Sequence, residues 1–342
     1  LLGGYFTTQL SWRWIFYINL PLGLISLGVI AVTLPRRPER VKHAVDYVGA
    51  TLLAVALSAI VVFTDLGGVH YPWRSAPMLA LGAISVITLG GFLWAESRAA
   101  EPVLPLRLFA NRTFTLTVAV GLVVGIAMFG SVTYLPLFLQ VVNGATPTGS
   151  GLQMVPMMGG MLFTSILSGQ LISRWGRYRI FPIVGTAVMA LGLYLLSRMD
   201  ADTSVARAAF DMMVLGLGLG LVMQVLVIAV QNSVDYRDLG VATSGATLFR
   251  LIGGSLGTAV FGAIFASGLS RNLERMLPPG TSSGLAVGGG GGLSPQMLAE
   301  LEPAMRAIYV NAFTTSLRTV FLAARGIAMV GFVLTWFVPE RP

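Results

Sequence analysis

The sequence has no cysteine, only two histidines and a single lysine, and charged residues make up 11% of its 342 residues. No disulfide framework, thiolate metal site or cysteine nucleophile is therefore available, and two histidines cannot assemble a metal cluster by themselves. A soluble globular domain carries about 25% charged residues. The scarcity of charge, together with 55% hydrophobic residues, indicates an all-α membrane protein.

Long uncharged runs, separated by turn residues, mark about nine candidate membrane spans. A helix needs about 20 apolar residues to cross a bilayer core of about 30 Å. The predicted spans are residues 12–34, 47–68, 77–95, 114–141, 151–173, 180–197, 208–231, 240–268 and 317–338. The uncharged stretch 113–173 is too long for one crossing, and Asn143-Gly144 and Pro147 predict a turn inside it. Residues 295–309 are predicted to form a short surface helix.

The basic residues gather at one end of these spans. The connections after the first, third, fifth and seventh spans, with the C-terminal tail, hold twelve: Arg36, Arg37, Arg40, Lys42, Arg98, Arg107, Arg112, Arg174, Arg177, Arg179, Arg237 and Arg341. The short connections at the other end hold four: Arg13, Arg74, Arg198 and Arg207. Positive loops face the cytoplasm, so we expect a plasma-membrane protein with a cytoplasmic C-terminus. Topology thus explains the net charge of +8 without nucleic-acid binding.

The segment GQLISRWGRYR, residues 169–179, closes the fifth span at the basic end. It resembles the loop motif G-x-L-x-D-R-x-G-R-R of the major facilitator superfamily, and the matching positions are Gly169, Leu171, Arg174, Gly176 and Arg177. Ser173 stands where the motif has Asp, which weakens a charge-relay role. Guanidinium groups in a short loop can bond helix-end carbonyls and acidic partners, so Gly169, Arg174, Gly176 and Arg177 are predicted gate residues. A basic loop that only follows the topology rule is the alternative.

The opening stretch, LLGG followed by SWRWIFYINLPLG, resembles the end of the antiporter motif and the sixth helix of fourteen-helix drug:proton antiporters of the EmrB/QacA type. The segments EPVLPLRLFANRTF, GLGLG and FRLIGGSLGTA extend the resemblance over essentially the whole chain. The resemblance implies a fragment of the major facilitator fold, helices six to fourteen of fourteen, that lacks the N-terminal helices.

The same resemblance implies a division of the chain into four parts. Residues 1–11 would be the remnant of an upstream helix and an outer loop, and residues 12–34 the last helix of an N-terminal bundle. Residues 35–112 would hold two linker helices with cytoplasmic loops. Residues 113–342 would form a C-terminal six-helix bundle with a long extracellular loop at 269–316.

Four charged residues fall inside predicted spans, namely Arg250, Arg325, Asp211 and Asp65. Each costs about 2.5 to 3.5 kcal/mol at a span centre on insertion scales. We expect Arg250, a turn or two from the cytoplasmic end, to hold the cytoplasmic gate, and Asp211 or Arg325 to contact cargo or the coupling proton. Asp65, on a linker helix, is expected to be peripheral. Snorkelling to the interface is the alternative for all four.

Polar and soft side chains in the last six spans are candidates for a cavity wall, with Gln153, Met157, Gln224 and Tyr134 as the selected positions. Methionine is flexible and polarizable, which suits varied hydrophobic cargo, although ordinary helix packing explains such residues equally well. Glycines four residues apart, such as Gly216 and Gly220, predict close approach of helix backbones.

The resemblance implies proton-coupled export of amphipathic, often cationic, small molecules, without a cofactor. The expected partners are these substrates, protons, the lipid bilayer and the missing N-terminal bundle, where the main coupling carboxylate would lie. No loop gathers acids, histidines or a Ser/His pair, so an enzyme is not predicted. The alternatives are a facilitator for another cargo, such as a sugar or a metabolite anion, and a membrane scaffold or sensor that transports nothing.

Overall fold

The chain folds into helices. The computed structural model describes residues 2–33, 46–67, 71–99, 101–276, 293, 297, 298 and 300–340. The helices are α1 (Leu2–Gln9), α2 (Trp14–Tyr17), α3 (Asn19–Thr33), α4 (Tyr47–Leu66), α5 (Ala76–Glu96), η1 (Leu106–Ala110), α6 (Arg112–Val132), α7 (Leu135–Val141), α8 (Pro147–Gln153), α9 (Val155–Trp175), α10 (Ile180–Leu196), α11 (Val205–Gln231), η2 (Tyr236–Asp238), α12 (Leu239–Met276) and α14 (Pro303–Thr335). Across these described ranges no strand occurs, apart from an isolated bridge between Gly67 and Tyr71.

The predicted all-α membrane architecture is confirmed. Eight described helical segments are long and apolar enough to cross a membrane, and Ile180–Leu196 adds an apolar helix of 17 residues, the lower limit for a crossing. Each of the nine predicted spans lies on one of these segments, in order. The sequence captured the spans because hydrocarbon accepts few charged groups and leaves a long uncharged run as the visible signature.

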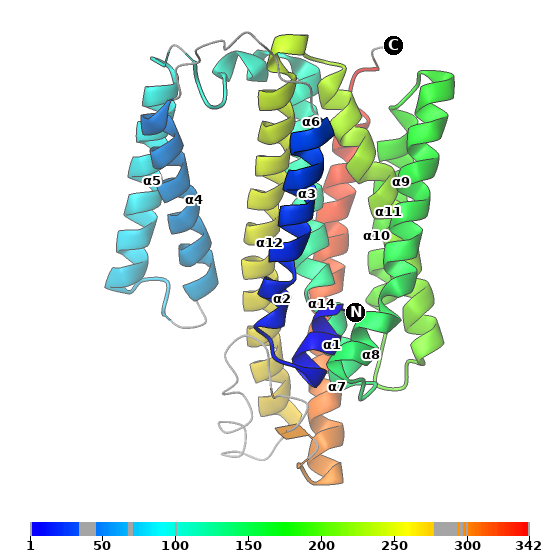
Figure 1. Cartoon of the computed structure of the whole chain (residues 1–342). Coiled ribbons are helices and arrows are strands. Elements are labelled where there is room, and N and C mark those ends of the chain that lie inside the picture. Colours follow the sequence, from blue (N-terminus) through cyan, green and yellow to red (C-terminus); the bar gives the residue numbers. More distant parts are fainter. Residues whose placement is uncertain are drawn as a thin grey trace.

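Six long helices form one bundle, with α6 beside α12, α9 beside α11, α10 beside α11, and α14 in contact with α6, α10 and α12 (Figure 1). Helix α11 is the most enclosed, since its span is 61% buried, whereas the span Trp14–Thr33 is 0% buried. An exposed apolar helix carries no hydrophobic penalty in lipid. Helix α11 therefore lies inside the bundle, and α3 presents its apolar surface outward.

Helices α4 and α5 pack on each other as a hairpin at one side of the bundle (Figure 1), and α4 contacts α12. The chain returns to the bundle through η1, where Arg107 Nη2 lies 2.8 Å from Asp238 Oδ1. Asn111 begins α6, because its Oδ1 accepts the Thr113 N–H at 3.0 Å, and its Nδ2 donates to the Ser233 carbonyl oxygen. These contacts fasten the connection from the hairpin to the η2 end of α11.

The helix directions place the basic connections together. Helices α5, α9 and α11 end, and α6, α10 and α12 begin, at the end of the molecule where the C-terminus lies (Figure 1). We call this the arginine-rich end, since Arg98, Arg112 and Arg177 lie in or beside its connections. The residues 34–45, which include the basic positions Arg36 and Lys42, lie outside the described part of the chain, as does Arg341.

Two predicted spans prove to be broken helices. The span predicted at 114–141 consists of α6 and α7, and the break falls at Thr133 and Tyr134, just before Pro136. The span predicted at 151–173 begins in α8 and is interrupted at Met154, before Pro156. Proline has no N–H to donate into a continuing helix, so the backbone turns at both positions.

The last helix is much longer than predicted. The surface helix predicted at 295–309 is wrong at its second half, because α14 runs without interruption from Pro303 through the predicted span, although Met297 and Leu298 before it are helical. The expected loop 269–316 is shortened at both ends, since α12 continues to Met276. Aromatic packing of Phe313 on Phe265, with ring centroids 5.2 Å apart, stabilises this extension beyond the most apolar segment.

Glycines allow the helices of the bundle to approach closely, as predicted from their spacing. A Cβ atom on Gly216 would lie 2.0 Å from the Met157 carbonyl oxygen of α9, and one on Gly220 would lie 2.1 Å from that of Met161. Gly253 of α12 faces the Leu122 carbonyl oxygen of α6 in the same way, at 2.2 Å. Both helix pairs are therefore in backbone contact at these positions.

Candidate functional site

A polar cavity of about 570 Å³ lies between α9 and α11 towards the arginine-rich end. Its walls consist of Ser165, Ile166, Gly169, Gln170, Ser173, Arg174 and Gln224. Ser165 and Gly169 are half-buried and the other lining residues are exposed, so hydroxyl, amide and guanidinium groups face one open volume on the surface of an apolar bundle, and polar groups at membrane depth are candidates for function. The cavity brings together Gly169, Arg174 and Gln224, three residues selected from the sequence.

Helix geometry explains this arrangement. Ser165, Gly169 and Ser173 are four residues apart on α9, so they lie along one face, and Ile166, Gln170 and Arg174 form the adjacent row. A Cβ atom added to Gly169 would have no neighbouring atom within 4 Å, so the cavity is open beside this residue. Ser165 and Ser173 were not selected from the sequence, although their four-residue spacing was a usable signal.

Helix α9 ends at Trp175, one residue after the last cavity-lining residue, Arg174. Gly176 has φ 69°, a left-handed conformation that L side chains rarely adopt, and its N–H donates to the Ile172 carbonyl oxygen at 2.8 Å. Arg174 therefore lies in the last turn, where a cation complements the helix dipole. The chain then reverses directly into α10.

The loop after Gly176 is anchored to the end of α14. The Tyr178 hydroxyl donates to the Pro339 carbonyl oxygen at 2.9 Å, and Arg179 Nη2 donates to the Trp336 carbonyl oxygen. Tyr178 is fully buried, whereas Arg177 is exposed. The motif region thus joins α9, α10 and α14 at the arginine-rich end.

Arg250 lies about three turns into α12, deeper than predicted. Its Nη1 donates to Met223 Sδ at 3.3 Å, and it shares a small cavity with Thr117 of α6 and Leu226 of α11. Among the residues that the structure describes around this cavity and the polar cavity, none is a carboxylate.

The other predicted intramembrane charges lie elsewhere. Asp211 on α11 is 3% exposed, and its Oδ2 has no hydrogen-bond partner in the described structure. Arg325 of α14 is exposed, with its guanidinium carbon 4.8 Å from the ring centroid of Tyr194 on α10. Tyr194 is two residues from the end of α10, so Arg325 is level with that helix end and not at a span centre. Asp65 belongs to α4, but its side chain lies outside the described residues.

Two of the predicted cavity residues are packed inside the bundle, and a third is half-buried at the end of α8. Met157 is buried against Gly216, and Tyr134 is buried with its ring centroid 5.2 Å from that of Phe265. Gln153 ends α8, with a buried Oε1 that has no partner among the described residues. The structure does not place these three on the wall of the polar cavity.

At the end of the molecule opposite the arginine-rich end, α1 packs on the start of α8 (Figure 1). A Cβ atom on Gly4 would lie 2.6 Å from the Pro147 carbonyl oxygen and 2.7 Å from Thr148 Cα. Only a residue without a side chain permits this backbone contact. The bundle is therefore held to the first helix at the end away from the polar cavity.

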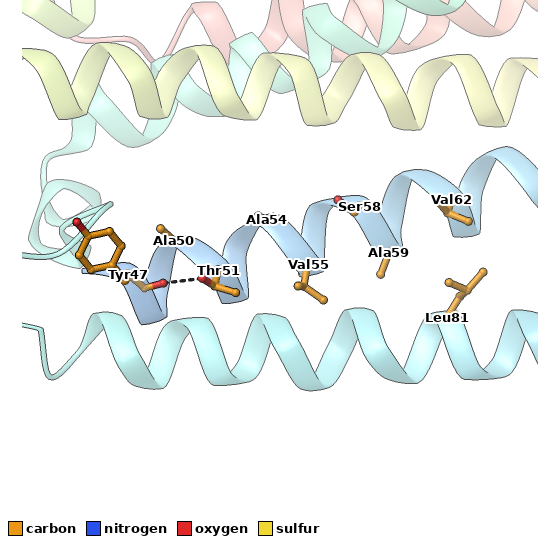
Figure 2. Close-up of a pocket in the computed structure, with 9 residues that line it drawn as sticks. All are labelled: Tyr47, Ala50, Thr51, Ala54, Val55, Ser58, Ala59, Val62 and Leu81. Atoms are coloured by element: carbon orange, nitrogen blue, oxygen red, sulfur yellow. Dashed lines mark hydrogen bonds between the residues drawn. The ribbon is translucent and has the colours of Figure 1, made fainter. Parts of the chain in front are cut away.

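A second cavity, of about 600 Å³, follows the hairpin helix α4. Figure 2 shows α4 between the ribbons of α5 and α12, and all the lining residues except Leu81 come from α4. One polar group there is already bonded, since Thr51 Oγ1 donates to the Tyr47 carbonyl oxygen at 2.7 Å. The groove is mainly apolar, so the α9–α11 cavity is the better candidate functional site.

Comparison with known proteins identifies related chains. The sequence profile described as Major Facilitator Superfamily matches residues 1–258. An uncharacterized MFS-type transporter of Mycobacterium tuberculosis is 43% identical over 342 residues, which cover 100% of this chain and 49% of the relative. The multidrug transporter protein MdtP of Bacillus subtilis is 40% identical over 280 residues, or 81% of this chain and 51% of the relative. This chain spans about half the length of these relatives.

More distant similarities agree with the fold. An efflux pump of Aspergillus niger is 30% identical over 353 residues, covering 100% of this chain and 66% of the pump. The crystal structure of a bacterial homolog of the human lysosomal transporter Spinster, inward-facing and occupied, superimposes with a TM-score of 0.53. That likeness has 16% sequence identity and covers 84% of this chain and 67% of the other, so it supports the helical fold alone.

Proposed function

We propose, because this chain belongs to the Major Facilitator Superfamily, that it is part of a proton-coupled multidrug efflux transporter of the fourteen-helix EmrB/QacA type. The polar α9–α11 cavity is the observation that carries the proposal, since it places hydrogen-bonding groups on the face of an apolar bundle. Relatives named as a multidrug transporter and an efflux pump support the cargo class. This chain covers about half the length of its relatives, which supports a partner bundle supplied by further N-terminal helices. In this proposal residues 12–34 belong to that bundle, residues 35–112 form the linker and residues 113–342 form the C-terminal bundle.

The transport cycle we propose is the rocking of two bundles about a central site. The α1–α8 contact closes one end, and the polar cavity lies towards the other. The positive-inside rule assigns the arginine-rich end to the cytoplasm, so this arrangement corresponds to loading from the cytoplasmic side. The short loop with Arg174, Gly176 and Arg177 then acts as the cytoplasmic gate, together with Arg250.

The cavity suits amphipathic cargo. Its volume of about 570 Å³ falls in the usual range for small-molecule sites, about 300 to 1,000 Å³. Ile166 offers an apolar contact, while Gln170 and Gln224 offer amide groups that both donate and accept hydrogen bonds. A site of this kind binds molecules that differ in shape but share an apolar body with a few polar groups.

The coupling proton requires a carboxylate that changes protonation as access changes. The resemblance assigns the main coupling acid to the N-terminal helices. Within the described bundle, Asp211 is a buried acid whose Oδ2 has no bonded partner, so we propose it as a contributing site. Neutral Asn in its place preserves shape but cannot release a proton.

The test uses proteoliposomes that contain the complete natural transporter and a fluorescent lipophilic cation such as ethidium. We expect an imposed pH gradient to drive dye movement, and Gln224→Ala to raise the apparent KM by about 2- to 12-fold through loss of one hydrogen bond. Gln231→Ala is the matched control, because Gln231 lies on the same helix outside the cavity. Dye movement that ignores the pH gradient would rule out proton coupling, and equal KM values for the two variants would rule out this cavity.

Asp211→Asn tests the contributing acid in the same vesicles. We expect loss of gradient-driven uptake, with exchange of dye down its own gradient retained. Unchanged gradient-driven transport in this variant would remove Asp211 from the coupling pathway without affecting the cavity assignment.

A second candidate function is transport of an organic anion. Arg174 lines the polar cavity and Arg250 lies in the neighbouring one, with no carboxylate on either described wall, and a cationic wall favours anionic cargo. Competition for dye movement by an amphipathic anion, abolished in Arg174→Gln, would favour this function over cation export.

A further inference from the structure

Two carboxylates meet at the arginine-rich end of the linker hairpin, away from the polar cavity. Asp46 precedes the first residue of α4, and its Oδ1 accepts the Gly49 N–H at 2.8 Å as an N-cap. Glu96 is the last residue of α5, and its Oε1 accepts the Leu104 N–H. One oxygen of each carboxyl group is thus committed to a backbone donor.

The second oxygen of each group is buried and has no hydrogen-bond partner in the described structure. The Glu96 residue is 4% exposed, and the charge of Asp46 is close enough to act on it. A Cβ atom on Gly49 would lie 2.3 Å from Asp46 Oδ2 and 3.3 Å from Glu96 Oε2. The two uncommitted oxygens therefore lie near the same point, the place that a Gly49 side chain would occupy, and no side chain separates them.

The charged and titratable groups on the surrounding elements are Tyr47 on α4, Arg98 and Glu101 after α5, and Arg107 with Asp238 across η1 and η2. The Arg98 guanidinium carbon lies 4.7 Å from the ring centroid of Trp94, and Arg107 pairs with Asp238. Across the described residues, no salt bridge joins Asp46 or Glu96 to a cation. Lys42 and His43, which precede Asp46 in the sequence, lie outside the described residues.

We propose that Asp46 and Glu96 bind one proton between them and form a proton site on the linker hairpin. Two ionised carboxylates side by side repel each other, whereas one shared proton removes a charge and supplies the missing hydrogen bond between their free oxygens. A hard divalent cation fits less well, because it requires six or more oxygen ligands and two of the four oxygens here already accept backbone N–H groups.

The proton site is connected to the transport bundle through Leu104. The Leu104 side chain is buried, and it contacts α12 so closely that a Cβ atom on Gly245 would lie 2.7 Å from Leu104 Cδ1. Because Glu96 holds the backbone of Leu104, the hairpin end and α12 are coupled. Loss of the proton places two negative charges beside Gly49 and drives the start of α4 away from the end of α5.

Infrared spectroscopy of the complete protein tests proton binding directly. In the unmodified protein at neutral pH we expect the carbonyl stretching band of a protonated carboxylic acid. In each of the single variants Glu96→Gln and Asp46→Asn, we expect this band to lose the intensity of one protonated carboxyl group. Either variant removes the partner needed for sharing, so each single change eliminates the same band. Glu101→Gln is the control and should leave the band unchanged. A band that survives either substitution, or no band in the unmodified protein, overturns the proposal.

The coupled movement is measured by distances between spin labels. Since the chain lacks cysteine, label pairs can be placed at Val48→Cys and Leu93→Cys, which are both exposed. We expect the distance between labels to lengthen when the pH is raised and to stay short in the isosteric Glu96→Gln variant. A pH-independent distance, or lengthening that persists in Glu96→Gln, contradicts the proposal.

Discussion

Replacement of Gly216 by alanine should destabilise the contact between α9 and α11. The added methyl carbon would lie 2.0 Å from the Met157 carbonyl oxygen and 3.0 Å from Met157 Cα. Ordinary contact begins at 3.4 Å, so the helices must move apart by more than about 1 Å. The obstructing atoms are backbone, which means that no side-chain rotation relieves the overlap.

The size of the effect follows from comparison with Gly159→Ala, on α9, where nothing lies within 4 Å of the added carbon. Both variants gain the helix propensity of alanine over glycine, about 1 kcal/mol, and this gain cancels in the comparison. Overpacking costs about 1 to 3 kcal/mol. We therefore expect Gly216→Ala to be less stable than Gly159→Ala by about 1 to 3 kcal/mol.

The assay is unfolding by sodium dodecyl sulfate in mixed micelles, followed by tryptophan fluorescence. The midpoint for Gly216→Ala should fall below that for Gly159→Ala, and Met157→Ala added to Gly216→Ala should not restore it. Equal midpoints for the two glycine variants would refute the close backbone contact. Rescue by Met157→Ala would show that a side chain, and not the carbonyl group, limits the approach.

Three further changes test local features at the arginine-rich end. Gly176→Ala should lower the free energy of unfolding by about 1 to 2 kcal/mol because of the left-handed φ of 69°. Gly176→Asn should lower it by less, and equal losses for the two variants in the same micelle assay would contradict the role of the left-handed backbone. Because the Arg107 side chain is 68% exposed, a double-mutant cycle of Arg107→Ala and Asp238→Ala should give a coupling free energy of about 0.2 to 1 kcal/mol that decreases with added salt. A larger coupling that does not depend on salt would argue for a buried ion pair. Asn111→Ala should cost about 0.5 to 2 kcal/mol through loss of the α6 cap, and an unchanged midpoint would show that the cap does not stabilise the helix.

The candidate site was only partly predictable. Gly169, Arg174 and Gln224 could be selected because a resembling motif or an isolated polar residue marks each of them in an apolar run. The convergence of these three residues on one cavity could not be predicted, because Gln224 lies on α11, far along the chain from the α9 positions. Met157 illustrates the converse: its soft side chain suits a cavity, but the approach of Gly216 buries it between helices.

The pair formed by Asp46 and Glu96 carried no sequence signal as a pair. Each acid stands at the end of a predicted span, where a charged residue is ordinary. Their meeting depends on the α4–α5 hairpin and on the absence of a side chain at Gly49. Helix ends that are close in space but separated by two whole helices in sequence are invisible to any local pattern.

The sequence by itself determined that the protein resides in lipid, where its nine described apolar helical segments lie and that basic residues gather at one end. These properties depend on the transfer of each segment from water to lipid, and transfer free energies are set by local composition. Only the tertiary structure decided where helices break and extend, which glycines bring backbones together and which polar groups share a cavity. Those outcomes depend on contacts between distant segments, and within lipid such contacts are governed by packing and hydrogen bonding and not by hydrophobicity.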